Sequence, residues 1–271
     1  MNGASREALA AARERLDALT DTTSTDVTRL ADELATVTAL LDREVSLRRV
    51  LTDPAQAGEA KAELVQRLIG GHVGGPTADL VAGAVRSRWS QPRDLVDALE
   101  ELADIADLTA AQQTGRLDDV EDELFRFGRI VASNTGLRAA LTDRKAGAAA
   151  KTELLNRLLG SRAVPTTERL MTRLVTAPRG RSLESGLESL SKLAAERRDR
   201  MVAVVTSAVP LSDPQKQRLG AALAKLYGRT MHLNLDVDPE VVGGMRVQVG
   251  DEVINGSLAD RLEDAARRMA S

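Results

Sequence analysis

The chain contains no cysteine and almost no aromatic side chains. The absence of cysteine excludes disulfides, thiol catalysis and thiolate metal ligands. Aromatic residues make up 1% of the 271 residues, and they are Trp89, Phe125, Phe127 and Tyr227. The hydrophobic cores must therefore consist mainly of leucine, valine and alanine, a composition that suits closely packed helices.

The sequence also lacks a strong net charge and a long apolar run. Charged residues make up 28% of the chain and the net charge is −3, so no overall field favours nucleic acid or an anionic membrane. A membrane-spanning helix needs about 20 nearly uncharged apolar residues. The nearest candidate, residues 68–85, contains His72, Pro76, Asp79 and several glycines, and residues 1–20 lack the apolar run of a signal peptide. We therefore expect no membrane insertion.

Patterns that would indicate catalysis or ligand binding are weak. The glycine-rich stretch 69–76 lacks the Lys-Ser/Thr ending of a P-loop and follows no strand, so we interpret it as an interhelical loop. The two histidines, His72 and His232, have no further ligands at metal-binding spacing. Carboxylates such as Glu100-Glu101 and Glu121-Asp122-Glu123 are expected to lie on solvated helix faces. We predict no catalytic residue, no cofactor and no metal site.

Arginines gather in two segments, and they leave a second function open. The residues are Arg86, Arg88 and Arg93 beside Trp89, and then Arg173, Arg179 and Arg181. An aromatic ring beside arginines can stack on a base, although such residues more often pack across a loop or lie at a protein contact. The alternative function is thus a helical nucleic-acid-binding or regulatory adaptor. The acidity of the chain and its few aromatics count against it.

The first two hundred residues have helical periodicity and contain a duplication. At an offset of 90 residues, Leu51-Thr52-Asp53 recurs as Leu141-Thr142-Asp143, and the segment 61–70 recurs at 151–160. After the arginine segments the offset falls to 88, where Leu95 matches Leu183. Matches at a fixed offset across four successive helices predict two tandem helical bundles of similar structure.

Leucines and alanines at helical spacing form a buried stripe in each expected helix. In the first copy these include Leu30, Leu34, Val37 and Leu41, the pair Leu64 and Leu68, the pair Leu80 and Ala84, and Leu95, Leu99 and Leu102. Only the first copy begins with a separate leading helix, residues 4–19. The second is preceded by residues 108–116, which can continue the helix before them.

Residues from Met201 onward change to the period-two alternation of strands. We predict a strand at 201–208, a helix opened by a capping box of Ser212 and Gln215, strands at 231–237 and 245–249, a further short strand and a final helix. The predicted fold is mainly α, with helical bundles at 1–110 and 111–200 and a small α/β domain at 201–271.

This C-terminal string resembles the signature of the ATP synthase delta (OSCP) subunit family, called the oligomycin-sensitivity-conferring protein in mitochondria. The signature residues, which we interpret as structural, are Pro210, Leu211, Ser212, Asp238, Pro239, Gly243, Gly244, Gly250, Asp251, Gly256, Ser257 and Arg261. Their order and spacing within about sixty residues make the resemblance specific. The chain departs from the family at Asn255, where Asp is usual.

The resemblance implies a structural subunit of a proton-translocating ATP synthase, not a catalyst. In this family the helical domain binds N-terminal helices of the alpha subunits, and the C-terminal domain holds the b subunit of the peripheral stalk. The protein would then lie on the cytoplasmic side of the plasma membrane, held there through the synthase complex. The duplicated helical region suggests the long, actinobacterial type of the subunit, without a role in nucleic-acid binding.

The family also suggests where an alpha-subunit helix would bind. The equivalent pair here is the leading helix 4–19 and the helix 77–85, which would form a groove in the first bundle. The residues expected to line this groove are Leu9, Ala12, Leu16, Leu19, Leu80 and Ala84. An alternative reading of the same stripe is that it only closes the bundle core.

Overall fold

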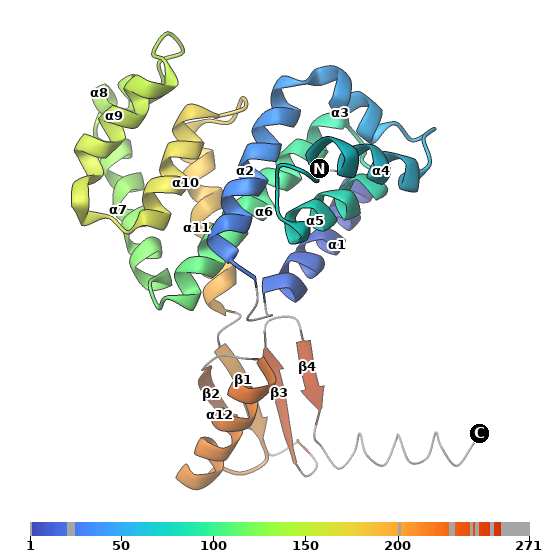
Figure 1. The fold of residues 1–271 in the computed structure, drawn as a ribbon. Coiled ribbons are helices and arrows are strands. Elements are labelled where there is room, and N and C mark those ends of the chain that lie inside the picture. The colour runs from blue at the N-terminus through green and yellow to red at the C-terminus, as the bar shows by residue number, and fades with distance from the viewer. Residues whose placement is uncertain are drawn as a thin grey trace. The chain divides into compact units, whose positions relative to one another are not determined.

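The computed structural model describes residues 2–20, 25–199, 202–227, 231–238, 241, 244–249 and 252–255. Within these ranges the chain forms twelve α-helices and a sheet of four strands (Figure 1). Its contacts divide it into a helical unit, Met1–Ala194, and a second unit, Ala195–Ser271, which contains the sheet. The predicted fold class, helices followed by a small α/β domain, is confirmed.

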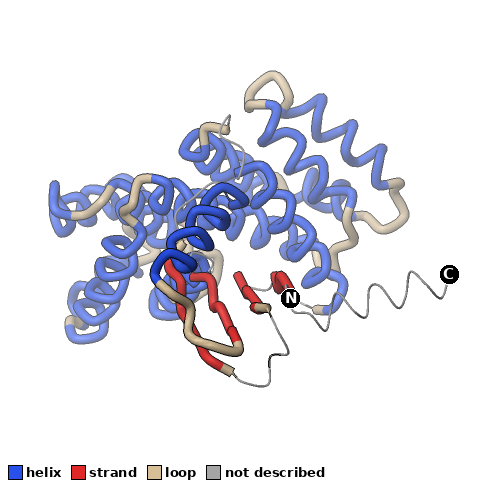
Figure 2. The backbone as a smooth tube through the Cα atoms, turned by 90° about the horizontal axis from the view of Figure 1, so that it is seen from below, coloured by secondary structure: helices blue, strands red, loops and turns tan. Residues whose placement is uncertain are grey.

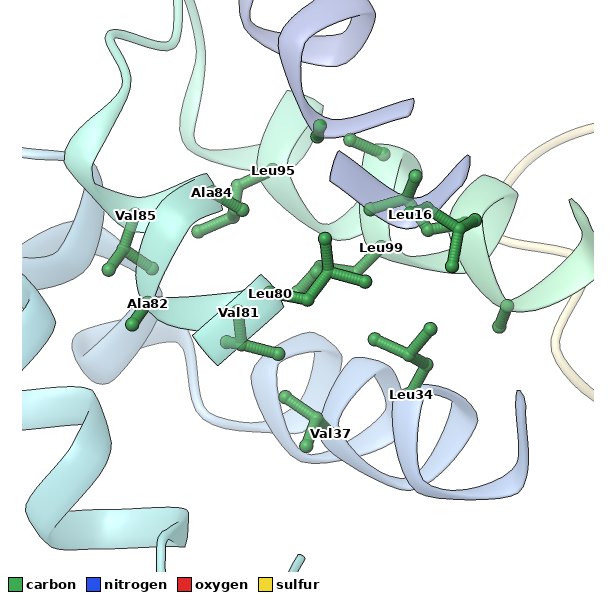
Figure 3. Packing of buried hydrophobic residues seen from close by; sticks show 14 of the residues in the cluster. Leu16, Leu34, Val37, Leu80, Val81, Ala82, Ala84, Val85, Leu95 and Leu99 are labelled. Carbon is green, nitrogen blue, oxygen red and sulfur yellow. The ribbon is translucent and has the colours of Figure 1, made fainter. Parts of the chain in front are cut away.

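Six helices make up the first part of the helical unit. They are α1 (Gly3–Thr20), α2 (Val27–Arg43), α3 (Val45–Thr52), α4 (Gly58–Ile69), α5 (Gly75–Arg86) and α6 (Pro92–Gln113). The Asp26 side chain accepts the Arg29 N–H at the start of α2, and Pro76 and Pro92 lie in the first turns of α5 and α6, where a missing N–H costs little. Leucines from four of these helices, including Leu34 and Leu99, form one core (Figure 3).

The next helices repeat this plan. They are α7 (Leu117–Ser133), α8 (Thr135–Thr142), α9 (Ala148–Leu159), α10 (Pro165–Thr176) and α11 (Leu183–Asp199), with a short 3₁₀ turn η1 (Gly160–Arg162) after α9. The lengths of α2 to α5 are 17, 8, 12 and 12 residues. The lengths of α7 to α10 are the same. Each of these four helices begins 90 residues after its counterpart, as the offset in the sequence predicts.

Equivalent residues also have similar surroundings. Leu64 and Leu154 are both half-buried, as we predicted for a pair of similar bundles. Lys61 and Lys151 are buried in both copies, and Lys151 Nζ lies 3.4 Å from the carbonyl oxygen of Val175, in the last turn of α10. Burial lowers the pKa of Lys61. The duplication therefore extends to unusual buried positions as well as to the leucine pattern.

Helix α6 contributes to both copies. It packs on α1, α2 and α3 of the first copy and on α7 and α10 of the second. Residues 108–113 continue α6 rather than forming a separate leading helix, so the proposed boundary at residue 110 falls inside this helix. Because α6 is shared, both copies lie in one compact unit, and their separation into two domains stays a prediction.

The second unit has a mixed sheet with strand order β2-β1-β3-β4. The strands are β1 (Val202–Ser207), β2 (His232–Val237), β3 (Met245–Val249) and β4 (Glu252–Asn255), and α12 (Asp213–Tyr227) connects β1 to the parallel β2. The β1–β3 and β3–β4 pairs are antiparallel. Ala203, Val205 and Val247 form the core with Leu223 of α12, which covers this face of the sheet (Figure 2).

The elements predicted for this unit are confirmed where the structure describes them. Gln215 Oε1 accepts from both the N–H and the hydroxyl of Ser212, at 2.8 Å each, so the capping pair forms through the glutamine side chain. The predicted turn at Gly250-Asp251 and the final helix from residue 257 lie outside the described residues.

Candidate interaction sites

The residues expected to line a partner groove lie mostly inside the first bundle. Ala12, Leu16, Leu80 and Ala84 are 0–1% exposed and belong to the core (Figure 3). Leu9 and Leu19 are half-buried and pack against it. These six residues are thus brought together, but in an arrangement that closes the bundle. Their role in partner binding stays a proposal.

The surface between α1 and α5 is covered by an arginine. Gly83 in α5 has no side chain, and the guanidinium of Arg15 from α1 lies over it. A Cβ atom at residue 83 would be 2.6 Å from Arg15 Nη1. A helix that approached here would meet Arg15 before it met the leucine stripe.

The equivalent contact in the second copy, between α6 and α10, contains buried ion pairs. Arg173 Nη1 lies 2.5 Å from Asp104 Oδ1, and Arg173 Nη2 lies 2.7 Å from Asp107 Oδ2. Arg169 Nε also donates to Asp107, whose side chain is 0% exposed. Arg173 stands 90 residues after Gly83, so the copies differ most where the first has its smallest residue.

A second group of charges joins the loop after α10 to α2 and α6. The side chain of Arg179 is 5% exposed and pairs with Asp42 at 3.0 Å and with Glu100 at 2.8 Å. Arg181 also pairs with Glu100. Arg179 has a φ of 49°, a left-handed conformation that costs about 1–2 kcal/mol in a non-glycine residue. These contacts fix the loop against helices of the first copy.

Burial changes the protonation of the carboxylates in this interface. Desolvation raises the pKa of Asp104 to about 7, although the positive charge of Arg173 opposes the change and the negative charge of Glu100 adds to it. Burial also raises the pKa of Asp97, one turn or more away on α6. A pocket of about 140 Å³ lies beside these residues, lined by Asp97, Glu100, Asp104 and Arg181 among others.

The interpretation of the acidic helix faces as solvated was wrong for Glu100, which is 2% exposed. Its partner Arg181 lies 81 residues further along the chain, and periodicity along one helix carries no information about such a contact. One signal was present in the sequence. Asp79 and Gly83 in the first copy become Arg169 and Arg173 in the second, within otherwise matching helices.

Most of the arginine segments are engaged in contacts within the chain. Arg173, Arg179 and Arg181 pair with carboxylates as described, Arg86 pairs with Glu59, and Arg93 donates to the carbonyl oxygen of Arg179 at 2.5 Å. The Trp89 side chain is 7% exposed and its Nε1–H donates to the carbonyl oxygen of Ala84. The buried arginines and tryptophan are therefore not displayed to a nucleic acid.

A glutamate at the start of α5 recurs in the second copy with fewer contacts. Glu33 Oε2 accepts the Gly74 N–H at 2.8 Å and the Thr77 hydroxyl at 2.5 Å. Its equivalent Glu123 accepts the Val164 N–H at 3.1–3.2 Å. The hydroxyl of Thr167, equivalent to that of Thr77, is buried without a hydrogen-bond partner among the described residues.

The signature residues that the structure describes lie in connections of the second unit. Pro210, Leu211 and Ser212 precede α12, the Asp238 N–H donates to the Ser207 carbonyl at 3.0 Å, and Gly244 has a φ of 92° that favours glycine. These positions shape loops and expose no reactive group, in agreement with a structural role. The remaining signature residues, Pro239, Gly243, Gly250, Asp251, Gly256, Ser257 and Arg261, lie outside the described residues.

Two searches for other kinds of site gave no candidates in the described part of the chain. No group of three or more His, Cys, Asp or Glu side chains there could hold a metal ion. None of the helices described is both long and apolar enough to cross a membrane. The His232 side chain, for which we expected exposure, is outside the described side chains.

Comparison with known proteins gives consistent matches. The sequence profile of the ATP synthase delta (OSCP) subunit family matches residues 105–269. The chain is 83% identical over 271 residues to the ATP synthase subunit delta of Streptomyces coelicolor, with 100% of this chain and 99% of that protein covered. It is 48% identical over 270 residues to the ATP synthase subunit delta of Thermobifida fusca, with 100% of both covered.

One solved structure was also matched. A chain of the Toxoplasma gondii mitochondrial ATP synthase hexamer is 19% identical, with 62% of this chain and 97% of that chain covered and a TM-score of 0.33. The score is too low for an argument about structure, so the family assignment depends on the sequence matches.

Proposed function

The chain belongs to the ATP synthase delta (OSCP) subunit family, and on this premise we propose that it is a non-catalytic stator subunit of a proton-translocating ATP synthase. It would link the catalytic head to the b subunit of the peripheral stalk, on the cytoplasmic side of the plasma membrane. The observation that carries the proposal is the match to delta subunits over the full length of the chain.

The helical unit suits attachment to the head. A stator has to resist the torque of the rotor, so its parts must not slide on one another. The buried pairs Arg173–Asp104, Arg173–Asp107 and Arg179–Glu100 hold the two copies at fixed positions, and breaking a buried pair is costly. N-terminal helices of the alpha subunits are the proposed partners, with the α1–α5 groove as one proposed contact.

The second unit suits attachment to the b subunit. β2 is an edge strand, and its Leu235 and Val237 are 37% and 45% exposed on the side of the sheet that α12 covers. Leu226 at the end of α12 is 65% exposed. Exposed apolar residues on one element pair are a suitable contact for an amphipathic helix. Two attachment points in one chain also raise the strength of the link through effective concentration.

Copurification of the full chain with the isolated catalytic head and with the soluble part of the b subunit tests the proposal. We expect one complex that contains all three, and loss of the head from it after proteolytic removal of the alpha-subunit N-termini. A chain that elutes apart from both the head and the b subunit would overturn the proposal. The nucleic-acid alternative gains no support, because the buried arginines are paired within the chain.

A further inference from the structure

An apolar groove on the first copy lies between α2 and the end of α4. It has a volume of about 550 Å³, within the usual range of binding pockets. Its apolar lining includes Ala39, Leu40, Ile69 and Val73, and Leu68 stands in it with 45% of its surface exposed. We had predicted Leu68 as part of a buried stripe, and this was wrong. A leucine so exposed in a groove is a feature that needs a partner or an explanation.

The same positions are exposed and apolar in the second copy. Ninety residues after Ala35, Leu40 and Leu68 stand Phe125, Ile130 and Leu158. Their exposed fractions are 62%, 50% and 46%. We name the two sets the α2–α4 surface (Ala35, Leu40, Leu68) and the α7–α9 surface (Phe125, Ile130, Leu158).

The repetition is evidence because the two copies have otherwise diverged. Gly83 became Arg173 and Trp89 became Arg179, yet a leucine is exposed to the same degree at residues 68 and 158. Neither leucine belongs to a hydrophobic core of the described structure. An exposed apolar side chain that recurs in equivalent places is better explained by a shared contact than by chance.

The margins of both surfaces are basic. The residues that line the α2–α4 groove include Arg43 and His72 and no carboxylate. The equivalents of those lining residues in the second copy include Arg126, Arg129 and Arg162, again without a carboxylate. Arg129 lies over the Phe125 ring, 5.9 Å from its centroid. An occupant with apolar residues on one face and acidic residues beside them would be complementary.

We propose that the α2–α4 and α7–α9 surfaces are two equivalent docking sites for one kind of partner, an amphipathic helix with acidic margins that the complex holds in more than one copy. Two equivalent sites on one chain fit two identical partner segments. The N-terminal segments of the alpha subunits meet this requirement, an identification that rests on the proposed function. These sites are additional to the α1–α5 groove.

Calorimetric titration of the full chain with a synthetic alpha-subunit N-terminal peptide tests this inference. A peptide of about 20 residues is long enough for more than five helical turns. Leu68→Asp and Leu158→Asp are each expected to lower the number of peptides bound by one, and the double variant by two, whatever the α1–α5 groove contributes. Because both leucines are exposed, the variants should stay folded, which circular dichroism checks.

Val45→Asp is the matched control, since Val45 is 44% exposed on α3 and outside the groove lining. It should bind as many peptides as the unaltered chain. Unchanged numbers and affinities in Leu68→Asp and Leu158→Asp would overturn the inference while leaving the stator function standing. So would self-association of the unaltered chain that Leu158→Asp abolishes, because the surface would then be a contact between two copies. Failure of copurification with the head would instead overturn the stator function itself.

Discussion

Arg173 in α10 and Gly83 in α5 occupy equivalent positions in the two helical copies, yet they form opposite kinds of contact. Gly83 makes room for Arg15 from the neighbouring α1. Arg173 extends toward α6 and pairs with Asp104 and Asp107. One substitution pattern thus separates a helix pair that admits a side chain from a helix pair that is closed by charge.

The buried pairs of Arg173 should contribute strongly to stability. Arg173→Met leaves the buried Asp104 carboxylate without this partner, so we expect the free energy of unfolding to fall by about 3–5 kcal/mol. Urea denaturation measures it. Arg126→Met is the control, because Arg126 and Asp122 form an exposed pair on α7 that should contribute about 0.5 kcal/mol or less. Equal effects of the two substitutions would contradict the assignment.

The stability of the helical unit should depend on the protonation of Asp104. Its pKa is raised to about 7 in the folded chain by burial, against about 3.9 for an unfolded aspartate. The folded state therefore binds the proton more tightly, and this contribution to stability is complete below about pH 4 and is lost as the pH rises through 7.

Asp104→Asn removes this titration. We expect the stability difference between the unaltered chain and Asp104→Asn to fall as the pH rises from 5 to 8, with a slope of at most about 1.4 kcal/mol per pH unit. Urea unfolding at a series of pH values measures the difference. A difference that is constant over this range, or that grows with pH, would be inconsistent with a raised pKa.

Thr77 and Thr167 should respond differently to the same substitution. The Thr77 hydroxyl donates to Glu33, while the buried Thr167 hydroxyl has no partner among the described residues. Thr77→Val should lower the free energy of unfolding by about 1 kcal/mol, and Thr167→Val should be neutral or stabilising. Each threonine is the control for the other. Destabilisation by Thr167→Val as large as that by Thr77→Val would show that the second hydroxyl has a partner.

Leu16 should be required for folding of the first copy. Its side chain is 0% exposed in the core, so Leu16→Asp should destabilise by more than about 4 kcal/mol through an unpaired buried charge. Thermal unfolding followed by circular dichroism measures this, with the exposed Ala10→Asp on the same helix as control. A Leu16→Asp chain that unfolds at the unaltered temperature would place Leu16 on a surface and support the original groove.

The sequence was informative wherever a contact is local or repeated. The alternation of Met231, Leu233 and Leu235 predicted β2, and the offset of 90 predicted four helix pairs of matching length. These features depend on backbone periodicity and on comparison of the chain with itself. Both are visible without any knowledge of which helices meet.

What could not be predicted depends on contacts between distant segments. Glu100 has the sequence surroundings of a surface residue, and only the packing of the loop at Arg179 and Arg181 against α6 buries it. Leu68 has the spacing of a core residue, but its helix ends too far from α2 to cover it. In both cases the position of a neighbouring helix, and not the pattern along one helix, decides exposure.

The sharing of α6 has a mechanical consequence. At 1.5 Å per residue its 22 residues span about 33 Å, and this single rod forms a wall of each copy. A pull on either copy is passed to the other along an unbroken hydrogen-bonded backbone, without a flexible joint between them. Duplication has therefore lengthened the arm without adding a hinge.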